Sequence, residues 1–277
     1  LRKTGAIRLS TTIATDVVLS RSGPKLGLIV TEGYNESAYS ERGSKNPAFD
    51  YVVPRDMVVG IEGQIDAAGK VAKPINEEKV RTVVKDLLVR GARVIVVSLL
   101  NSALNPSQEE QVKAIVEGDY PKHYLGSVPV LLSTEVSVST DNAARTNAAL
   151  LSAYTRHELS KLLYKTDDEL RKKGYLKPLL IVHNWGGVAR VAKTRPMYTY
   201  RSGVAAGLFG AAFFSKLYQL NNLVALDIGG TTASIGAIVN GQAPMKPFKF
   251  RFLVKRVFLF SMFRFMQMFS VPVFLER

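Results

Sequence analysis

Residues 223–232, Leu-Val-Ala-Leu-Asp-Ile-Gly-Gly-Thr-Thr, join an apolar run to an acidic side chain, two glycines and two hydroxyls. Glycine lets a backbone approach a bulky anion, and the exposed N–H groups of such a turn form a nest for phosphate oxygens. Asp227, at the predicted strand end, can hold a hydrated Mg²⁺ near the phosphates. The segment therefore predicts a nucleotide-phosphate turn. The residues expected to hold the phosphates of the nucleotide are Gly229, Gly230, Thr231 and Thr232.

Two other segments carry side chains that could bind or activate a ligand. His183 and Asn184 follow a short apolar run, and the imidazole could orient a substrate carbonyl or act as a general base. A strand-end histidine that only satisfies a loop is an equally open interpretation. Ser202 and Gly203 begin a helical pattern whose N–H groups could bind an anion. An N-cap serine is the more frequent explanation of such a residue.

Short apolar strands alternate with helical patterns along most of the chain, which is typical of an α/β fold. Strands are expected at residues 26–30, 93–98, 128–132 and 179–182, and a hairpin at 62–70. Helices are expected at residues 76–90, 106–117, 142–173 and 203–220, the first two with Asn76 and Asn105 as N-caps.

Two further strands, at residues 223–226 and 233–239, are expected on either side of the glycine turn. This order of strand, turn and strand differs from the Rossmann and P-loop motifs, in which the glycine-rich turn leads from a strand into a helix. The phosphate turn is therefore expected to belong to another class of nucleotide-binding fold.

Composition limits the classes of protein that remain. The chain has 277 residues, no cysteine and a formal net charge of +14. The absence of cysteine excludes disulfides and thiolate metal sites and is compatible with a cytoplasmic location. Residues 245–277 hold seven basic residues and one acidic residue, and the other positive charge is spread along the chain. Nucleic-acid binding is therefore not expected.

The segment 243–277 differs abruptly from the rest, because nine of the thirteen phenylalanines lie between Phe248 and Phe274. Three interpretations stay open: a membrane-surface or anchoring segment, an oligomer contact, or residues outside the native reading frame. The last is favoured because no helical or strand period organises the segment. Arg264 and Pro272 interrupt its longest apolar run, so a membrane contact is not the preferred interpretation.

Several motifs, in order along the chain, resemble the hydantoinase A/5-oxoprolinase family. Residues 98–109, Ser-Leu-Leu-Asn-Ser-Ala-Leu-Asn-Pro-Ser-Gln-Glu, are similar to that family's LLHSYLNPxHE stretch. Further similar segments are Ser-Thr-Thr at 10–12, Ser-Thr-Glu-Val at 133–136, Val-His-Asn-Trp-Gly-Gly at 182–187 and Ser-Gly-Val-Ala-Ala-Gly at 202–207. The turn at 227–232 resembles the phosphate loop of the actin-like ATPase superfamily. The resemblance covers about residues 4–242.

The resemblance implies ATP- and Mg²⁺-dependent opening of a five-membered cyclic amide, a hydantoin or 5-oxoproline. Asp227 would then hold Mg²⁺ and, with His183, carry the catalysis, while Thr11, Thr12 and Asn184 would lie near the substrate. The alternative to a place near the substrate is that Thr11 and Thr12 only form a buried polar turn. Close relatives that carboxylate acetone or acetophenone share the implied chemistry, in which phosphorylation activates an amide or enolate oxygen.

The sequence departs from the family pattern in three places. Family members open with an Asp-x-Gly-Gly-Thr strand pair, and this sequence starts after it. The usual DxGGTTTD loop has Ser234 in place of its second acidic residue, and the usual SGPAAG has Val204 in place of proline. We therefore expect these residues to supply one half of an ATP site.

The expected fold is α/β of the actin-like ATPase (ribonuclease H-like) type, incomplete at both ends. Residues 1–175 would form a hydantoinase/oxoprolinase N-terminal-type domain, 176–242 the start of the second lobe and 243–277 an atypical basic tail. The expected function is ATP-dependent cyclic amide hydrolysis with a second, hydantoinase B-type subunit. The alternatives are an acetone- or acetophenone-carboxylase-like subunit and, in a different class, a non-catalytic assembly protein.

Overall fold

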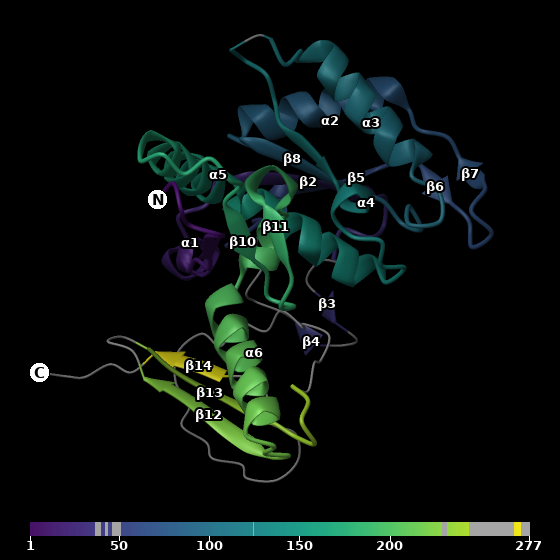
Figure 1. Cartoon of the computed structure of the whole chain (residues 1–277). Coiled ribbons are helices and arrows are strands. Elements are labelled where there is room, and N and C mark those ends of the chain that lie inside the picture. The colour runs from purple at the N-terminus through teal and green to yellow at the C-terminus, as the bar shows by residue number, and fades with distance from the viewer. Residues whose placement is uncertain are drawn as a thin grey trace, which may run out of the picture. The chain divides into compact units, whose positions relative to one another are not determined.

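The computed structural model describes residues 1–36, 40–41, 44–45, 51–123, 125–228, 232–243 and 269–272. These residues form two compact units (Figure 1). Unit 1 contains Leu1–Thr15 and the described residues from Ser160 onward, and unit 2 contains the described residues of Asp16–Leu159. The domain boundaries expected from the sequence stay a prediction.

Unit 2 is built on a parallel four-stranded sheet with the order β5-β2-β8-β9. All six residues of β2 are buried, as expected for a strand covered on both faces. The strands are β2 (Leu26–Thr31), β5 (Val58–Ile61), β8 (Val94–Ser98) and β9 (Val130–Leu132). The short strands outside this sheet form two hairpins, β3 (Ser40–Glu41) with β4 (Ser44–Lys45) and β6 (Gln64–Ile65) with β7 (Val71–Lys73).

Helices α2 (Glu77–Val89) and α3 (Ser107–Asp119) pack on each other and against this sheet (Figure 1). The remaining helices that begin in or enter unit 2 are α1 (Ile13–Ser20), η2 (Arg55–Met57), α4 (Ser133–Val136) and α5 (Asn142–Lys172). The alternation of helices and strands confirms the α/β class, and the expected helices and strands of this unit are found within a few residues of their predicted ends.

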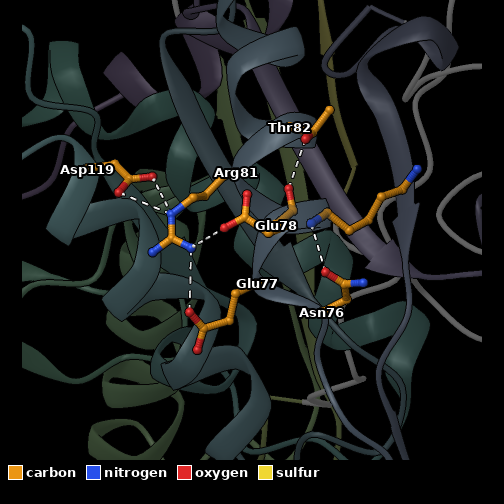
Figure 2. A network of polar contacts seen from close by, with 7 residues as sticks. Asn76, Glu77, Glu78, Arg81, Thr82 and Asp119 are labelled. Carbon is orange, nitrogen blue, oxygen red and sulfur yellow. Dashed lines mark hydrogen bonds and ion pairs between the residues drawn. The ribbon is translucent and has the colours of Figure 1, made fainter.

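The N-terminus of α2 forms a polar network with the end of α3 (Figure 2). Asn76 is the N-cap, as predicted, because its side chain accepts a hydrogen bond from the N–H of Lys79 at 3.1 Å. Arg81 contacts Asp119 on α3 at 3.3 Å and two glutamates of its own helix. These side chains are substantially exposed, so the network joins the two helices at the surface and contributes little to the free energy of unfolding.

Helix α3 starts one residue later than predicted. Pro106 is its N-cap and makes no side-chain cap hydrogen bond. The Asn105 side chain still accepts a hydrogen bond from the N–H of Ser107 at 3.0 Å, and so it satisfies one of the free donors of the first turn. The predicted capping residue therefore has its expected effect from a position just outside the helix.

The first turn of α3 carries a fully buried carboxylate, Glu109, with 0% of its surface exposed. Its Oε1 accepts hydrogen bonds from the N–H of Leu99 at 2.9 Å and from the hydroxyls of Ser102 and Ser133 at 2.7 and 2.6 Å. Its Oε2 accepts from the N–H and the hydroxyl of Thr134 at 3.1 and 2.9 Å. Five donors from two segments, residues 99–102 and 133–134, thus converge on one side chain.

Arg145 of α5 provides the opposite charge and is also fully buried. Its Nε donates to the Ser133 hydroxyl at 2.9 Å, and that hydroxyl in turn donates to Glu109. Its Nη2 donates to the carbonyl of Leu99 at 2.8 Å and to the side chain of Asn142 at 2.7 Å. Burial lowers the pKa of Arg145, and the charge of Glu109 acts in the opposite direction. The Ser133 hydroxyl therefore bridges the two charges.

Unit 1 contains two three-stranded sheets, with the orders β1-β10-β11 and β12-β13-β14. In the first, β1 (Arg8–Leu9) pairs in parallel with β10 (Leu180–Val182), which pairs antiparallel with β11 (Val188–Arg190). The second contains β12 (Leu223–Ile228), β13 (Thr232–Ile238) and β14 (Phe269–Pro272), all antiparallel. Two short 3₁₀ helices, η3 (Val191–Lys193) and η4 (Pro196–Thr199), follow β11.

Helix α6 (Ser202–Leu217) packs on β12 and β13 (Figure 1). The pairing of β12 with β13 confirms the predicted order of strand, turn and strand. Most of the tail, residues 244–268 and 273–277, lies outside the described residues, so the three interpretations of this segment stay open. Among the helices that the structure describes, none has the length and apolar character that a membrane crossing requires.

Replacing Glu109 with glutamine should destabilise unit 2. An amide would place its N–H₂ group among the donors that now face a carboxylate oxygen. It would also remove the larger of the two negative charges that act on the buried Arg145, those of Glu109 and Asp141. We expect a loss of about 3–5 kcal/mol, seen as a lower urea midpoint by circular dichroism.

The neighbouring exposed carboxylate, Glu110, is the matched control. Glu110→Gln should change the free energy of unfolding by less than about 0.5 kcal/mol. Equal midpoints for the two variants would show that the buried network does not stabilise the unit.

Candidate functional site

The parallel pairing of β1 with β10 brings two predicted site segments to one edge of a sheet. Arg8 lies opposite Leu180 and Leu9 opposite Ile181. Since parallel strands run in the same direction, residues 10–12 and residues 183–184 leave the sheet at the same end. Thr11 and Thr12 therefore lie in the same region of unit 1 as His183 and Asn184, although the two pairs are about 170 positions apart in the sequence.

The two threonines differ in their surroundings. The hydroxyl oxygen of Thr11 accepts a hydrogen bond from the N–H of Ile13 at 3.2 Å, which satisfies a donor at the start of α1. Thr12 is exposed, and Thr11 is half-buried. A buried polar turn does not describe these residues, so their role near a substrate stays a prediction.

The start of α6 lies at the same edge. The N–H of Arg201 donates to the hydroxyl of Thr15 at 3.2 Å, and a β-carbon on Gly203 would lie 3.9 Å from the hydroxyl of Ser10. Ser202 and Gly203 are therefore brought together with the residues that follow β1 and β10.

Ser202 is not the N-cap of α6. The cap is Arg201, which has a φ of 56° in the left-handed region, and Ser202 is the first residue of the helix. The Ser202 side chain is fully buried, and among the described residues its hydroxyl has no hydrogen-bond partner. The N-cap interpretation is therefore wrong, and the anion-binding role of Ser202 stays a prediction.

Residues 183–187 form a tight turn between β10 and β11. The N–H of His183 donates to the carbonyl of Gly187 at 2.8 Å, and the N–H of Gly186 donates to the carbonyl of His183 at 3.0 Å. A β-carbon on Gly186 would lie 2.4 Å from the ring of Phe209, and one on Gly187 would lie 1.8 Å from the ring of Trp185. Both glycines are needed because an aromatic ring occupies the space that a side chain would take, and Gly186 also has a φ of +90°.

Hydrogen bonds of Asn184 connect the segment around η4 to this turn. Its N–H donates to the carbonyl of Tyr198 at 2.7 Å, and its Nδ2 donates to the carbonyls of Met197 and Tyr200, each at 3.1 Å. Both side-chain donor hydrogens are thereby used within unit 1. Asn184 therefore positions the segment that carries Tyr198 and Tyr200. In the predicted contact with substrate, the atom that would take part is the carbonyl oxygen of the Asn184 side chain.

The ring of His183 is buried, with 3% of the residue exposed. Its Nε2 contacts the hydroxyl oxygen of Thr194 at 3.4 Å, while the Thr194 hydroxyl donates its one hydrogen to the carbonyl of Arg190 at 3.1 Å. The Thr194 oxygen must therefore accept from Nε2, which places the ring hydrogen on Nε2 and leaves a lone pair on Nδ1. Burial lowers the pKa of His183, which favours this neutral form.

Nδ1 of His183 is buried and has no hydrogen-bond partner among the described residues. A buried acceptor without a donor is unfavourable by about 1–3 kcal/mol. The geometry therefore suits a neutral histidine that accepts a hydrogen bond or a proton from a bound molecule. The backbone contacts with Gly186 and Gly187 also suit a histidine that satisfies its own loop, so both interpretations stay open.

Two aromatic residues surround this ring and were not selected from the sequence. The ring centroids of Trp185 and Tyr198 lie 5.6 and 5.4 Å from that of His183, and 6.5 Å from each other in an edge-to-face arrangement. The guanidinium carbon of Arg195 lies 6.0 Å from the Tyr198 ring centroid. The signal that could have identified this cluster is the only tryptophan of the chain, directly before two glycines.

The predicted phosphate turn joins β12 to β13. Asp227 at the end of β12 is exposed and lies opposite Ser234 of β13, so their side chains emerge on the same face of the hairpin. Residues 229–231 lie outside the described residues, and Thr232 begins β13. Gly229, Gly230 and Thr231 therefore keep their predicted role, which no described contact tests.

The residues around Asp227 fit a magnesium nucleotide better than a bound metal ion alone. The described residues contain no group of three or more side chains that could hold a metal. Mg²⁺ in nucleotide sites takes one or two carboxylates and completes its shell with water and phosphate oxygens. One exposed carboxylate beside a glycine turn satisfies that requirement only when the phosphates are present. Helix α6 links this hairpin to the site at the β1–β10 edge, since it contacts β10, β12 and β13.

Comparison with protein-family models assigns most of the chain. The hydantoinase/oxoprolinase N-terminal region matches residues 2–119, and the hydantoinase/oxoprolinase model matches residues 145–252. The acetophenone carboxylase gamma subunit of Aromatoleum aromaticum is 36% identical over 260 residues, which cover 88% of this chain and 35% of that protein.

Two solved structures share the fold. The nucleotide-free structure of acetone carboxylase has a TM-score of 0.78 and 26% identity, over 87% of this chain and 36% of that one. The ATP-dependent caprolactamase of Pseudomonas jessenii has a TM-score of 0.73 and 22% identity, over 85% of this chain and 35% of that one. The chain thus spans about a third of the length of these relatives. The matched models and the fold show that the chain belongs to the hydantoinase/oxoprolinase family.

Proposed function

We propose that this chain is part of an ATP-dependent enzyme that opens a small cyclic amide by activating its carbonyl oxygen with phosphate. The observation that carries the proposal is the antiparallel pairing of β12 with β13, which places Asp227 just before the sequence Gly-Gly-Thr-Thr in a member of this family. Mg·ATP would supply the phosphoryl group. The residues that would hold it are Asp227 for the ion and Gly229, Gly230, Thr231 and Thr232 for the phosphates.

The substrate would bind at the β1–β10 edge. The lone pair on Nδ1 of His183 would accept a hydrogen bond or a proton from the ring N–H of an amide. The buried hydroxyl of Ser202 and the N–H groups of the first turn of α6 would face a negative charge, since helix N-termini favour anions. Thr11, Thr12 and Asn184 would line the same region.

An acetophenone-carboxylase-like subunit is the second candidate. It is favoured by the identity of 36% to the gamma subunit of that enzyme, a higher value than the 25% shared with 5-oxoprolinase 1 of Arabidopsis thaliana. Both candidates need the same first step, the transfer of phosphate to an oxygen that is otherwise a poor leaving or acceptor group. They differ in the second step: water would react with the phosphorylated amide in the hydrolase, and a carbon centre would react in the carboxylase.

The whole enzyme would contain more than this chain. The aligned part makes up about a third of each relative's own length, and several relatives are named as subunits. We propose that further protein completes the ATP site in the manner of actin-like ATPases, and that a second, hydantoinase B-type subunit is the partner. A non-catalytic assembly role would require that the phosphate turn bind no nucleotide.

Substituting Asp227 with alanine should weaken Mg·ATP binding. Removing the carboxylate takes away the protein ligand of the ion, so we expect a dissociation constant at least about tenfold higher by isothermal titration calorimetry. Asp168→Ala, which removes an exposed carboxylate from α5, should leave the affinity unchanged. Absence of ATP binding by the unaltered chain, or equal affinities for all three proteins, would support the assembly role for this chain.

The stability of unit 1 should fall as the pH is lowered below about 6.5, the ordinary pKa of histidine. Because burial lowers the pKa of His183, the unfolded chain takes up a proton before the folded one does. Stability is therefore greatest above the unfolded pKa, and the loss is complete once the pH is below the folded pKa. The fluorescence of Trp185, the only tryptophan, reports the unfolding of this unit.

His183→Gln should remove this part of the pH dependence, so that its urea midpoint changes less between roughly pH 7 and pH 5 than that of the unaltered chain. His157→Gln is the matched control because His157 lies exposed on α5. A slope that is the same in all three proteins would contradict the buried, neutral state of His183.

A further inference from the structure

The sheet of β12, β13 and β14 has one face that the described residues leave exposed. Helix α6 packs on β12 and β13 (Figure 1), and Leu223 and Ala225, which point to that side, are half-buried. The large apolar side chains on the other face are between 49% and 73% exposed. They are Val224, Leu226 and Ile228 of β12 and Ile235 of β13.

This exposed face is continuous and uncharged along β12. Leu226 lies directly opposite Ile235, so their side chains lie on the same face. Asp227, the one charged residue of β12, alternates with the exposed apolar residues and therefore lies on the face that α6 covers. A continuous apolar surface of this kind marks a contact with another apolar segment and does not suit a charged partner.

The chain itself supplies an apolar segment that is attached to this sheet. Strand β14 pairs with β13, with Phe269 opposite Ile235. Residues 255–268, which lie outside the described residues, lead directly into Phe269 and contain no acidic residue. Nine of these fourteen residues are apolar, namely Val257, Phe258, Leu259, Phe260, Met262, Phe263, Phe265, Met266 and Met268.

Attachment to β14 favours this segment over a separate molecule. A tethered segment meets the face of its own sheet at a high effective concentration, because closing so short a loop costs little entropy. Fourteen extended residues reach at most about 50 Å, whereas the outer strands of a three-stranded sheet lie only about 10 Å apart. A second copy of the chain has no such tether, and it would bring another net charge of +14.

We propose that residues 255–268 dock on the exposed face of β12 and β13 and bury Val224, Leu226, Ile228 and Ile235. The contact is made by the phenylalanines and methionines of the segment, since aromatic rings bury a large area and methionine adapts to an irregular surface. Docking makes the segment part of the folded unit 1, in contrast to residues outside the native reading frame. The inference needs neither nucleotide nor substrate and is independent of the proposed function.

The protection of a single thiol tests whether the face is covered. The chain has no cysteine, so one introduced thiol reports on one position. Leu226→Cys places the thiol on the face, and Leu176→Cys is the matched control because Leu176 is 82% exposed in the same unit. Each rate of modification by a maleimide is divided by the rate of the same variant unfolded in urea. Leu226→Cys should react at least about tenfold more slowly than the control, because it reacts only when the segment is undocked.

Substitutions in the segment identify what covers the face. Replacing Phe258, Phe260, Phe263 and Phe265 with serine in the Leu226→Cys chain should bring its rate to within about twofold of the control, since the apolar contact is lost. Lys255→Gln with Arg256→Gln, which changes the same segment without removing apolar side chains, should keep the protection. The fluorescence of Trp185 checks that unit 1 stays folded in each variant.

A cross-link gives a second measurement that leaves most of the contact in place. Leu226→Cys is combined in turn with cysteine at each of the four phenylalanine positions. At least one pair should form an intrachain disulfide on mild oxidation, at a rate independent of protein concentration, because a disulfide needs Cα atoms within about 7 Å. The same pairs built with Leu176→Cys should form it at least about tenfold more slowly.

Four results would overturn the inference. Equal normalised rates for Leu226→Cys and Leu176→Cys would show that the face is open. Protection that rises with protein concentration, together with cross-links between chains, would assign the face to a second copy. Protection that appears only when vesicles of phosphatidylcholine and phosphatidylglycerol are added would assign it to a membrane surface. Protection that survives the four serine substitutions would assign the cover to another part of the chain.

Discussion

The buried carboxylate of Glu109 is the constraint on which unit 2 depends. A charge with no exposed surface is tolerated only when its lone pairs are occupied and a countercharge is near. Meeting that condition requires the end of β8, the turn after it, the start of α4 and the first part of α5 to converge on α3. The network therefore specifies how these elements pack, which an apolar contact could not do as selectively.

Unit 1 depends on a different kind of constraint, the exclusion of side chains. Rings of Phe209 and Trp185 lie where Gly186 and Gly187 would otherwise carry β-carbons. This close approach holds the turn after β10 against α6, while the parallel register of β1 and β10 brings the residues after β1 to the same edge. Backbone packing therefore brings the candidate substrate residues to one edge of the sheet.

The sequence predicted the elements well because their signals are local. Apolar runs, the Asn76 cap and the glycine after α2 identify helices and strands without reference to the rest of the chain. The candidate site was predicted in part, since His183, Asn184 and Ser202 were selected by residue type. The role of Trp185 and the buried Glu109–Arg145 network depend on contacts between distant segments, which periodicity in a single sequence does not reveal.

The replacement of the second acidic residue by Ser234 is less damaging to the phosphate turn than its position suggests. Ser234 lies directly opposite Asp227 in the hairpin, so the usual pair of carboxylates would have faced each other across two strands. Like charges in that arrangement repel unless a cation lies between them. With serine there, Asp227 is the one carboxylate of this opposed pair, and no second carboxylate lies across the hairpin from it. In the proposed function, a single carboxylate would be sufficient for a metal ion that enters together with the phosphates and completes its shell with water.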